Sequence, residues 1–359
     1  MHTDQPEMIH ECKLRSINPR RPRRQSVAKS PKTCDSGVLE AGLAVMIVDA
    51  YTHIWESPQQ LGRTVENLLP RALGRRQVAA SSIAQAELET GAPTASPPQH
   101  LAACEHADRT IVVGFKSRYL GANVPNDYVA DYVKQHSDRM IGFAGVDPAN
   151  VREALSDVDQ AYHDLGMKGV AIAPAAQDFH PAGTSACRVY EKLNELQLPM
   201  LVHQGIYFSA RNKLEYAKPV LLDQVARDFP DLKIIIAHMG YPWIDEVVVL
   251  LGKHPNVFSD VSGLLTQSWR AYNALLTAYQ YGVIDKLLFG SGFPFTSTAD
   301  SIEALYGVNQ MCQGTELPII PREQLRGIVE RPTLTLLGID PVAEPRDDSS
   351  KGSLLDDDE

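Results

Sequence analysis

The sequence predicts an α/β protein, a (β/α)8 TIM barrel in a single domain with disordered terminal extensions. Eight short runs, apolar along most of their length, are spaced through the middle of the chain. Runs of this kind are typical of strands buried on both faces of a parallel sheet. Amphipathic helical patterns lie between most of them. The stretch from 46 to 340 holds about 295 residues, which suits one barrel of about 250 residues with insertions.

The strands are expected near the following residues: 46–50, 110–115, 140–145, 169–173, 199–203, 233–238, 256–260 and 286–290.

The helices are predicted from periodicity and from proline and glycine. Residues 151–165 carry apolar side chains at helical spacing. Pro219 suits the first turn of a helix, and a second helix is expected to start at Pro242 and end at Gly252. The alternative is a doubly wound open sheet. No G-x-G-x-x-G follows an early strand, which weakens a dinucleotide-binding form of that fold.

The composition excludes several classes of protein. Of 359 residues, 44% are hydrophobic and 22% are charged, as in a globular protein with a large core. The net charge of -10 repels phosphate backbones, so no nucleic-acid partner is expected. No apolar run approaches the roughly 20 residues of a membrane helix, so no membrane partner is expected either. The five cysteines are scattered and form no C-x-x-C pair, which favours reduced thiols and a cytoplasmic location.

The two ends of the chain differ from the middle. Residues 1–45 contain a basic run, with eight Lys or Arg and no acid between Lys13 and Lys32, and are expected to be disordered. Met46 is the first residue of the first expected strand, so a second hypothesis is that translation starts there. Residues 341–359 carry seven acids and two bases and are expected to form a solvated, disordered tail. The barrel is therefore expected to span 46–340.

Candidate site residues follow the expected strands. In TIM barrels the active site lies at the carboxyl ends of the strands. Histidines at three such ends favour a metal site or a proton-transfer site. The eighth strand ends in "GSGFPF", with no charged group. In chain order, the candidates are Tyr51, His53, His203, His238, Asp260 with Ser262, and Gly292.

Long motifs in a fixed order give the chain a family resemblance. From Met46 to about Asp340 it resembles the amidohydrolase-related family of the amidohydrolase superfamily. The motifs include "MIVDAYTHIWE", "LGMKGVAIAP", "LPMLVHQG", "KIIIAHMGYPW", "HPNVFSDVSG" and "KLLFGSGFPF". The resemblance implies a TIM barrel of hydrolases and non-oxidative decarboxylases, many of which hold one divalent metal. It implies no nucleotide cofactor.

The resemblance also implies roles for individual residues. His53 matches the second histidine of an H-x-H metal-binding pair, His203 a strand-five metal ligand and His238 a strand-six catalytic residue. Two positions depart from the pattern, because Tyr51 replaces the first histidine and Gly292 replaces the strand-eight aspartate. Catalytic zinc usually has three protein ligands. A zinc or manganese ion would thus have a reduced ligand set, His53 and His203.

The expected function is that of an enzyme of this family with a modified metal site. It would hydrolyse or decarboxylate a small carboxylated cyclic or aromatic compound. One alternative is a metal-free, lactonase-like hydrolase, and another is a non-catalytic barrel that binds a ligand or a partner. The family's members often pair, so a homodimer is expected. The residues expected to line the substrate pocket are Tyr51, Tyr241, Trp243 and Gly292.

Overall fold

A computed structural model describes residues 46–65, 94–205 and 209–339. The predicted terminal extensions, 1–45 and 341–359, lie outside the described residues. So does the stretch 66–93.

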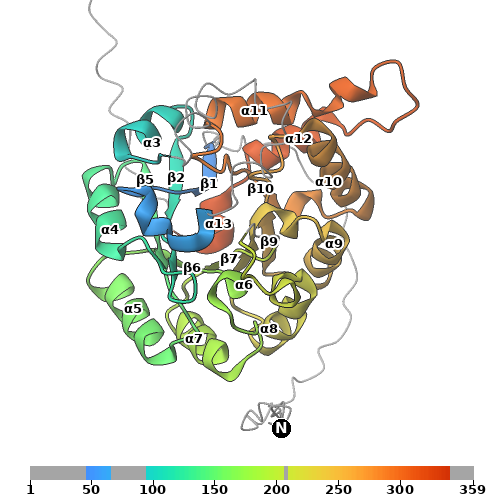
Figure 1. The fold of residues 1–359 in the computed structure, drawn as a ribbon. Helices are drawn as coiled ribbons and strands as arrows, with labels where there is room; N and C mark the ends of the chain where they lie inside the picture. Colours follow the sequence, from blue (N-terminus) through green and yellow to red (C-terminus); the bar gives the residue numbers. More distant parts are fainter. Residues whose placement is uncertain (1–45, 66–93, 206–208, 340–359) are drawn as a thin grey trace, which may run out of the picture. The chain divides into compact units, whose positions relative to one another are not determined.

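The eight predicted strands are confirmed, and they form one parallel sheet (Figure 1). Each strand pairs with the next along the chain, in the order β1-β2-β5-β6-β7-β8-β9-β10. Their bounds are β1 Val48–Thr52, β2 Arg109–Val113, β5 Met140–Gly145, β6 Gly169–Ile172, β7 Met200–Val202, β8 Ile234–Ile236, β9 Val257–Asp260 and β10 Leu287–Leu288.

The sheet closes between its first and last strands. The His53 backbone N–H donates to the Phe293 carbonyl at 3.1 Å. The Gly292 N–H donates to the Tyr51 carbonyl at 2.9 Å. These bonds join the end of β1 to the loop after β10, which confirms the (β/α)8 barrel over the open sheet.

Helices surround the barrel, as Figure 1 shows. The α-helices are α3 Pro97–Ala103, α4 Asn126–Gln135, α5 Val151–His163, α6 Pro174–Gln177, α7 Thr184–Glu195, α8 Leu222–Asp228, α9 Ile244–Lys253, α10 Ser268–Tyr281, α11 Thr298–Tyr306, α12 Arg322–Val329 and α13 Thr333–Leu337. Short 3-10 turns are η1 Pro58–Val65, η3 Leu214–Ala217, η4 Pro219–Leu221, η5 Ala237–Gly240, η6 Ile284–Lys286 and η7 Val308–Cys312. A small antiparallel hairpin, β3 Lys116–Ser117 with β4 Ala122–Asn123, was not predicted.

One predicted helix boundary is wrong. The helix expected from Pro242 to Gly252 runs from Ile244 to Lys253. Trp243 is the N-cap, with φ -88° and ψ 52° outside the helical region, so helical geometry begins at Ile244 rather than at the proline. Pro219 does start a helical turn, the 3-10 turn that leads into α8.

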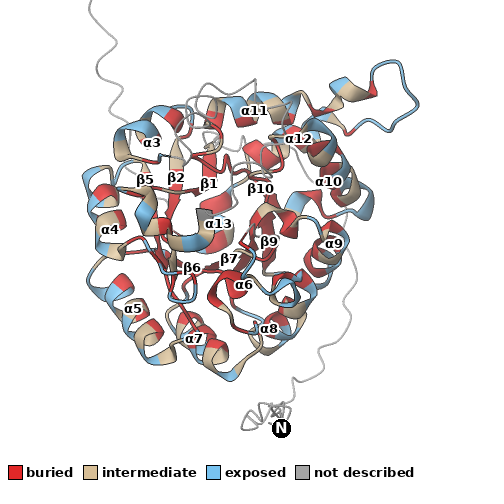
Figure 2. Ribbon diagram, in the orientation of Figure 1, coloured by how far each residue is buried: buried red, intermediate tan, exposed pale blue. Residues whose placement is uncertain are grey.

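The core has two layers, and Figure 2 shows buried residues on the strands and on the inner faces of the helices. The outer layer packs the helices against the barrel wall. The inner layer fills the barrel and includes Val48, Phe143 and Phe258. Leu334 and Leu337 of α13 belong to this inner layer, so the last helix closes the amino-terminal end of the barrel. No helix among the described residues is long and apolar enough to cross a membrane.

Candidate active site

The first strand fixes Tyr51 and His53 at the mouth of the barrel. The His53 ring contacts the Tyr51 ring edge-on, with centroids 4.8 Å apart. His53 Nδ1 lies 2.8 Å from the Val113 carbonyl, which can only accept a hydrogen bond, so Nδ1 carries the proton and Nε2 has the lone pair. Burial lowers the pKa of His53 to about 4. Burial, and then the charge of Asp260, raises the pKa of Tyr51 well above its ordinary value, so its hydroxyl remains a donor.

His203 and His238 form a direct pair. His203 follows β7 and His238 follows β8, and their Nε2 atoms lie 3.1 Å apart. His238 Nδ1 lies 2.9 Å from the Ser262 carbonyl and donates its proton there. Its Nε2 therefore has the lone pair, and His203 Nε2 donates the proton between them. Burial lowers the pKa of His238 to about 4 and that of His203 well below its ordinary value.

The backbone around His238 is strained. His238 has φ +55° and Met239 has φ +48°, both in the left-handed region that side chains rarely adopt. Such strain is concentrated at functional sites, where the surrounding structure holds it. Here Asp260 supplies part of that support, because its Oδ1 accepts a hydrogen bond from the His238 backbone N–H at 3.2 Å.

Asp260 lies behind His238 and does not line the pocket. Its side chain is fully buried at the end of β9. Oδ1 also accepts hydrogen bonds from the backbone N–H and the hydroxyl of Ser262, while Oδ2 has no partner among the described residues. Burial raises the pKa of Asp260 to about 6. Asp260, Ser262, His238 and His203 thus form one connected chain of polar groups.

Gly292 is a turn residue whose side-chain space is already taken. Its φ is +80°, which favours glycine. A β-carbon there would lie 3.3 Å from the Ser262 β-carbon and 3.3 Å from the Gly263 nitrogen, closer than ordinary contacts. The segment after β9 therefore packs closely against the position where the resemblance implies an aspartate, so a side chain there would require Ser262 or Gly263 to shift.

Asp49 is a site-supporting residue that the sequence prediction missed. It is fully buried in β1. It accepts hydrogen bonds from the Ser291 backbone N–H and the Thr298 hydroxyl, both at 2.8 Å. Asp49 thereby holds the loop after β10 against β1. An acid inside the otherwise apolar "MIVDA" was the available signal, because a buried charge needs dedicated partners.

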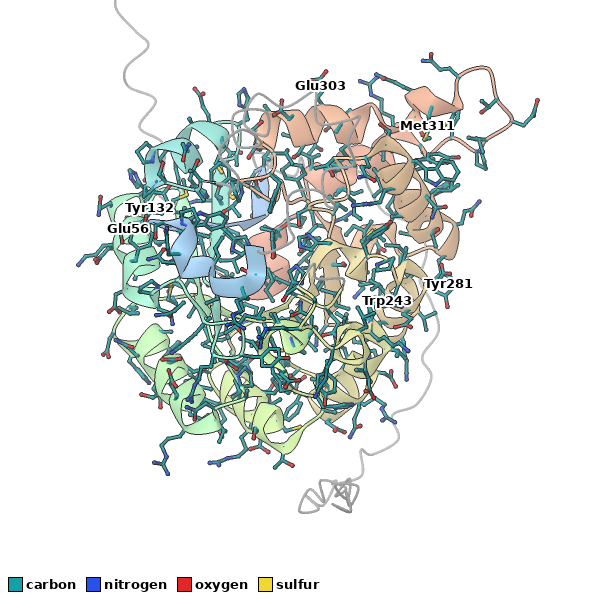
Figure 3. All side chains as sticks on the ribbon, in the orientation of Figure 1. Glu56, Tyr132, Trp243, Tyr281, Glu303 and Met311 are labelled. Carbon is teal, nitrogen blue, oxygen red and sulfur yellow. The ribbon has the colours of Figure 1, made fainter. Side chains whose placement is uncertain are left out.

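A pocket of about 230 Å3 opens at the carboxyl ends of the strands. Of the predicted pocket residues, Tyr51, Tyr241 and Gly292 line it, together with His53, His203 and His238. Trp243 is not among its lining residues; it is the N-cap of α9, and Figure 3 labels it beside that helix. The pocket walls are otherwise mainly apolar, from Trp55, Leu61, Val113, Phe115, Val124, Ile172, Leu201, Leu264 and Phe295.

Arg270 is the second residue that the sequence prediction missed. It lies in the first turn of α10 and lines the pocket. Its guanidinium carbon is 4.1 Å from the centroid of the Tyr241 ring. No pattern in "LTQSWRAYN" distinguishes this arginine from a solvated surface residue, so no sequence signal was available.

The side chains present do not fit the ordinary metal site of the family. The Nε2 atoms of His203 and His238 are close enough to share one ion, but Gly292 offers no ligand. In the three described segments, no group of three or more His, Cys, Asp or Glu side chains is arranged to hold a metal ion. Catalytic zinc sites usually need three protein ligands.

The buried histidines make the stability of the fold depend on pH. His53 and His238 have a pKa of about 4 in the folded chain, against 6.5 for an ordinary histidine, so the unfolded chain binds more protons. Their contribution is complete above pH 6.5 and is lost as the pH falls through about 4. Asp260 opposes this between about pH 6 and 3.8, and so do other carboxyls whose pKa burial raises, such as Asp49. The lowered pKa values of His100 and His203, however, add to the histidine effect. We expect the Tm, measured by differential scanning fluorimetry, to fall from pH 7 to 4.5. A Tm that stays level or rises over that range would contradict the assignment of neutral, buried imidazoles.

Solved structures of other proteins share the fold. An uncharacterized TIM-barrel protein from Bordetella bronchiseptica aligns with a TM-score of 0.63 and 21% identity over 82% of this chain and 98% of the other. A probable 2-pyrone-4,6-dicarboxylic acid hydrolase from Acinetobacter baumannii gives 0.53 and 16% over 81% and 99%. A 5-carboxyvanillate decarboxylase from Novosphingobium aromaticivorans, complexed with manganese, gives 0.55 and 14% over 82% and 97%. At these identities the likeness shows the fold alone.

Sequence comparison gives the lineage. A curated relative, the uncharacterized protein y4mH of Sinorhizobium fredii, is 25% identical over 187 residues, which span 46% of this chain and 60% of that protein. The amidohydrolase family model matches residues 48–330, well over half of the chain. This protein therefore belongs to the amidohydrolase family.

Proposed function

We propose that this chain is a hydrolase of a small carboxylated cyclic or aromatic compound, with His238 as the general base and no requirement for a metal. The observation that carries the proposal is the His203–His238 pair, with Nε2 atoms 3.1 Å apart on the wall of an apolar pocket. His238 is oriented from behind by Ser262 and Asp260. A base held by an oriented partner is the arrangement that general acid–base catalysis requires.

The chemistry proposed for His238 is the activation of water. Its Nδ1 proton is directed at the Ser262 carbonyl, so Nε2 is the basic atom; its lone pair, which accepts from His203 Nε2–H in the free pocket, removes a proton from a water molecule that displaces that donor. The water oxygen attacks the substrate carbonyl carbon, and the carbon–oxygen bond of the ring breaks. His238 then returns the proton to the leaving oxygen. Asp260 Oδ1, 3.8 Å from Nδ1, stabilises the imidazolium that forms in between.

Tyr51 and the other two histidines are proposed to hold the substrate. The Tyr51 hydroxyl stays protonated, because burial raises its pKa, and can donate to the carbonyl oxygen on which charge develops. His53 presents an Nε2 lone pair, since Nδ1 donates to Val113. His203 donates its Nε2 proton to His238 in the free pocket. These groups replace the polarisation that a metal supplies in other members of the family.

Two proteins that share the fold support the proposed substrate class. The probable hydrolase from Acinetobacter baumannii is named for a pyrone dicarboxylic acid, which is a carboxylated cyclic ester. The enzyme from Novosphingobium aromaticivorans is named for an aromatic acid and is complexed with manganese. A zinc- or manganese-dependent decarboxylase is thus the second candidate. The ligand set argues against it, because Gly292 and Tyr51 stand where two of the family's ligands would be.

The proposal is tested by assaying hydrolysis before and after metal removal. The substrates would be coumalate, a pyrone monocarboxylate, and other carboxylated lactones, with hydroxybenzoates as decarboxylation substrates. We expect lactone hydrolysis whose kcat/KM changes less than about twofold after dialysis against a chelator, and substoichiometric metal by elemental mass spectrometry. A rate that is lost on dialysis and restored by zinc or manganese would contradict the metal-free mechanism. Carbon dioxide release without hydrolysis would instead establish the decarboxylase.

A further inference from the structure

We propose that Arg270 binds the carboxylate of the substrate and so selects anionic rings over neutral ones. This inference rests on the proposed function, because it names the group that recognises that enzyme's substrate.

The position of Arg270 is suited to binding a substrate. The chain leaves β9 at Asp260, turns through Ser262 and Gly263, and enters α10 at Ser268. This places Arg270 in the first helical turn, on the same connection that orients His238. Both Arg270 and His238 line the pocket.

The guanidinium of Arg270 is held in place, and no carboxylate of the described residues forms an ion pair with it. It stacks on the Tyr241 ring at 4.1 Å, which fixes its plane and leaves its N–H edges available. Its Nε is buried and has no hydrogen-bond partner within the described part of the chain. A buried donor without an acceptor destabilises the folded protein, so such groups usually have a purpose.

The chemistry of the pocket points to a carboxylate as that partner. No Asp, Glu or Lys is found among the described residues that line the pocket, so Arg270 faces no competing or neutralising charge from them. A guanidinium binds a carboxylate through two parallel hydrogen bonds, which neutral groups cannot match. The apolar walls suit the rest of a planar ring, and dry walls strengthen the ion pair.

The test uses benzoate and its neutral counterpart benzamide, neither of which contains the cyclic ester that the enzyme is proposed to open. Binding to the full chain would be measured by ligand-observed NMR titration. We expect benzoate to bind about tenfold more tightly than benzamide, as one charge-assisted hydrogen-bonded pair should give. Arg270→Gln should reduce this preference to less than about twofold, and Arg270→Lys should recover part of it because the charge remains. Equal binding of the two probes, or no benzoate binding, would overturn the inference.

Two controls keep the test decisive. Arg188→Gln removes an exposed arginine of α7 that does not line the pocket, and should leave the preference unchanged. If Arg270→Gln lowers the Tm too far for titration, Arg270→Lys carries the test. We expect that variant to keep only part of the wild-type preference for benzoate over benzamide. A fully unchanged preference in Arg270→Lys would overturn the inference. Loss of preference in Arg188→Gln would overturn the assignment to Arg270.

The outcome is separable from that of the proposed function. A benzoate preference that depends on Arg270, without lactone hydrolysis, would retain the carboxylate site and reject the hydrolase. Hydrolysis of neutral lactones at a rate that Arg270→Gln leaves unchanged would retain the hydrolase and reject the carboxylate site.

Discussion

Replacing His238 with asparagine is expected to lower kcat for lactone hydrolysis by about 10³-fold, within the 10²–10⁴ range that general acid–base catalysis contributes. The His238 Nε2 lone pair is the proposed base, and an asparagine amide cannot remove a proton from water. Asparagine tolerates positive φ better than most residues, so the backbone at +55° should be kept. The measurement is steady-state kinetics with each active lactone, which separates kcat from KM.

The matched control is His163→Asn, which changes an exposed histidine in α5. It should leave kcat within about twofold of the wild type, as expected for surface substitutions. A His238→Asn variant with a wild-type Tm and a loss of less than tenfold would remove His238 from the mechanism.

Replacing Asp260 with asparagine is expected to lower kcat about 10²-fold while raising stability. The raised pKa of about 6, against an ordinary 3.8, means that the fold disfavours the ionised carboxylate by about 3 kcal/mol at pH 7, above both values. A neutral amide avoids that cost, and its oxygen can still accept from the His238 and Ser262 backbone N–H groups. What is lost is the negative charge 3.8 Å from His238 Nδ1, which stabilises the imidazolium during the reaction.

The opposite signs of the two effects make this prediction specific. A merely damaged core would lower both kcat and Tm. Asp159→Asn, which removes a half-exposed carboxylate paired with Lys192 in the outer ring of helices, should change neither by much. Asp260→Asn with unchanged kcat would show that Asp260 serves only the architecture of the turn.

The barrel could be predicted because its signals are local. Each strand is a short apolar run, and the run at 140–145 matches β5 at both ends. The hairpin at Lys116–Ser117 and Ala122–Asn123 was missed because two-residue strands have no periodicity to detect. The start of α9 was missed by two residues because Trp243, which follows the proline, has non-helical dihedrals that no local pattern in the sequence indicates.

The site was predictable only in part. His203 and His238 lie 35 positions apart, yet the strand ends bring them together as the fold class requires. The sequence identified Gly292 as a departure from the family pattern, but could not show that Ser262 and Gly263 fill the space beside it. Arg270 could not be found at all, because what distinguishes it is three-dimensional packing: its guanidinium lies over the Tyr241 ring, and its buried Nε has no hydrogen-bond partner among the residues that the structure describes.

The position of α13 has a consequence for how the chain is made. The interior of the barrel joins Val48 and Ala50, near its beginning, to Leu334, Leu337 and Ile339, near its end. Until residue 339 has left the ribosome, the eight strands can assemble only around an interior that is open at the amino-terminal end of the barrel. We therefore expect the barrel to become compact only after α13 has left the ribosome, with chaperones binding the unsealed apolar interior of the nascent chain until then.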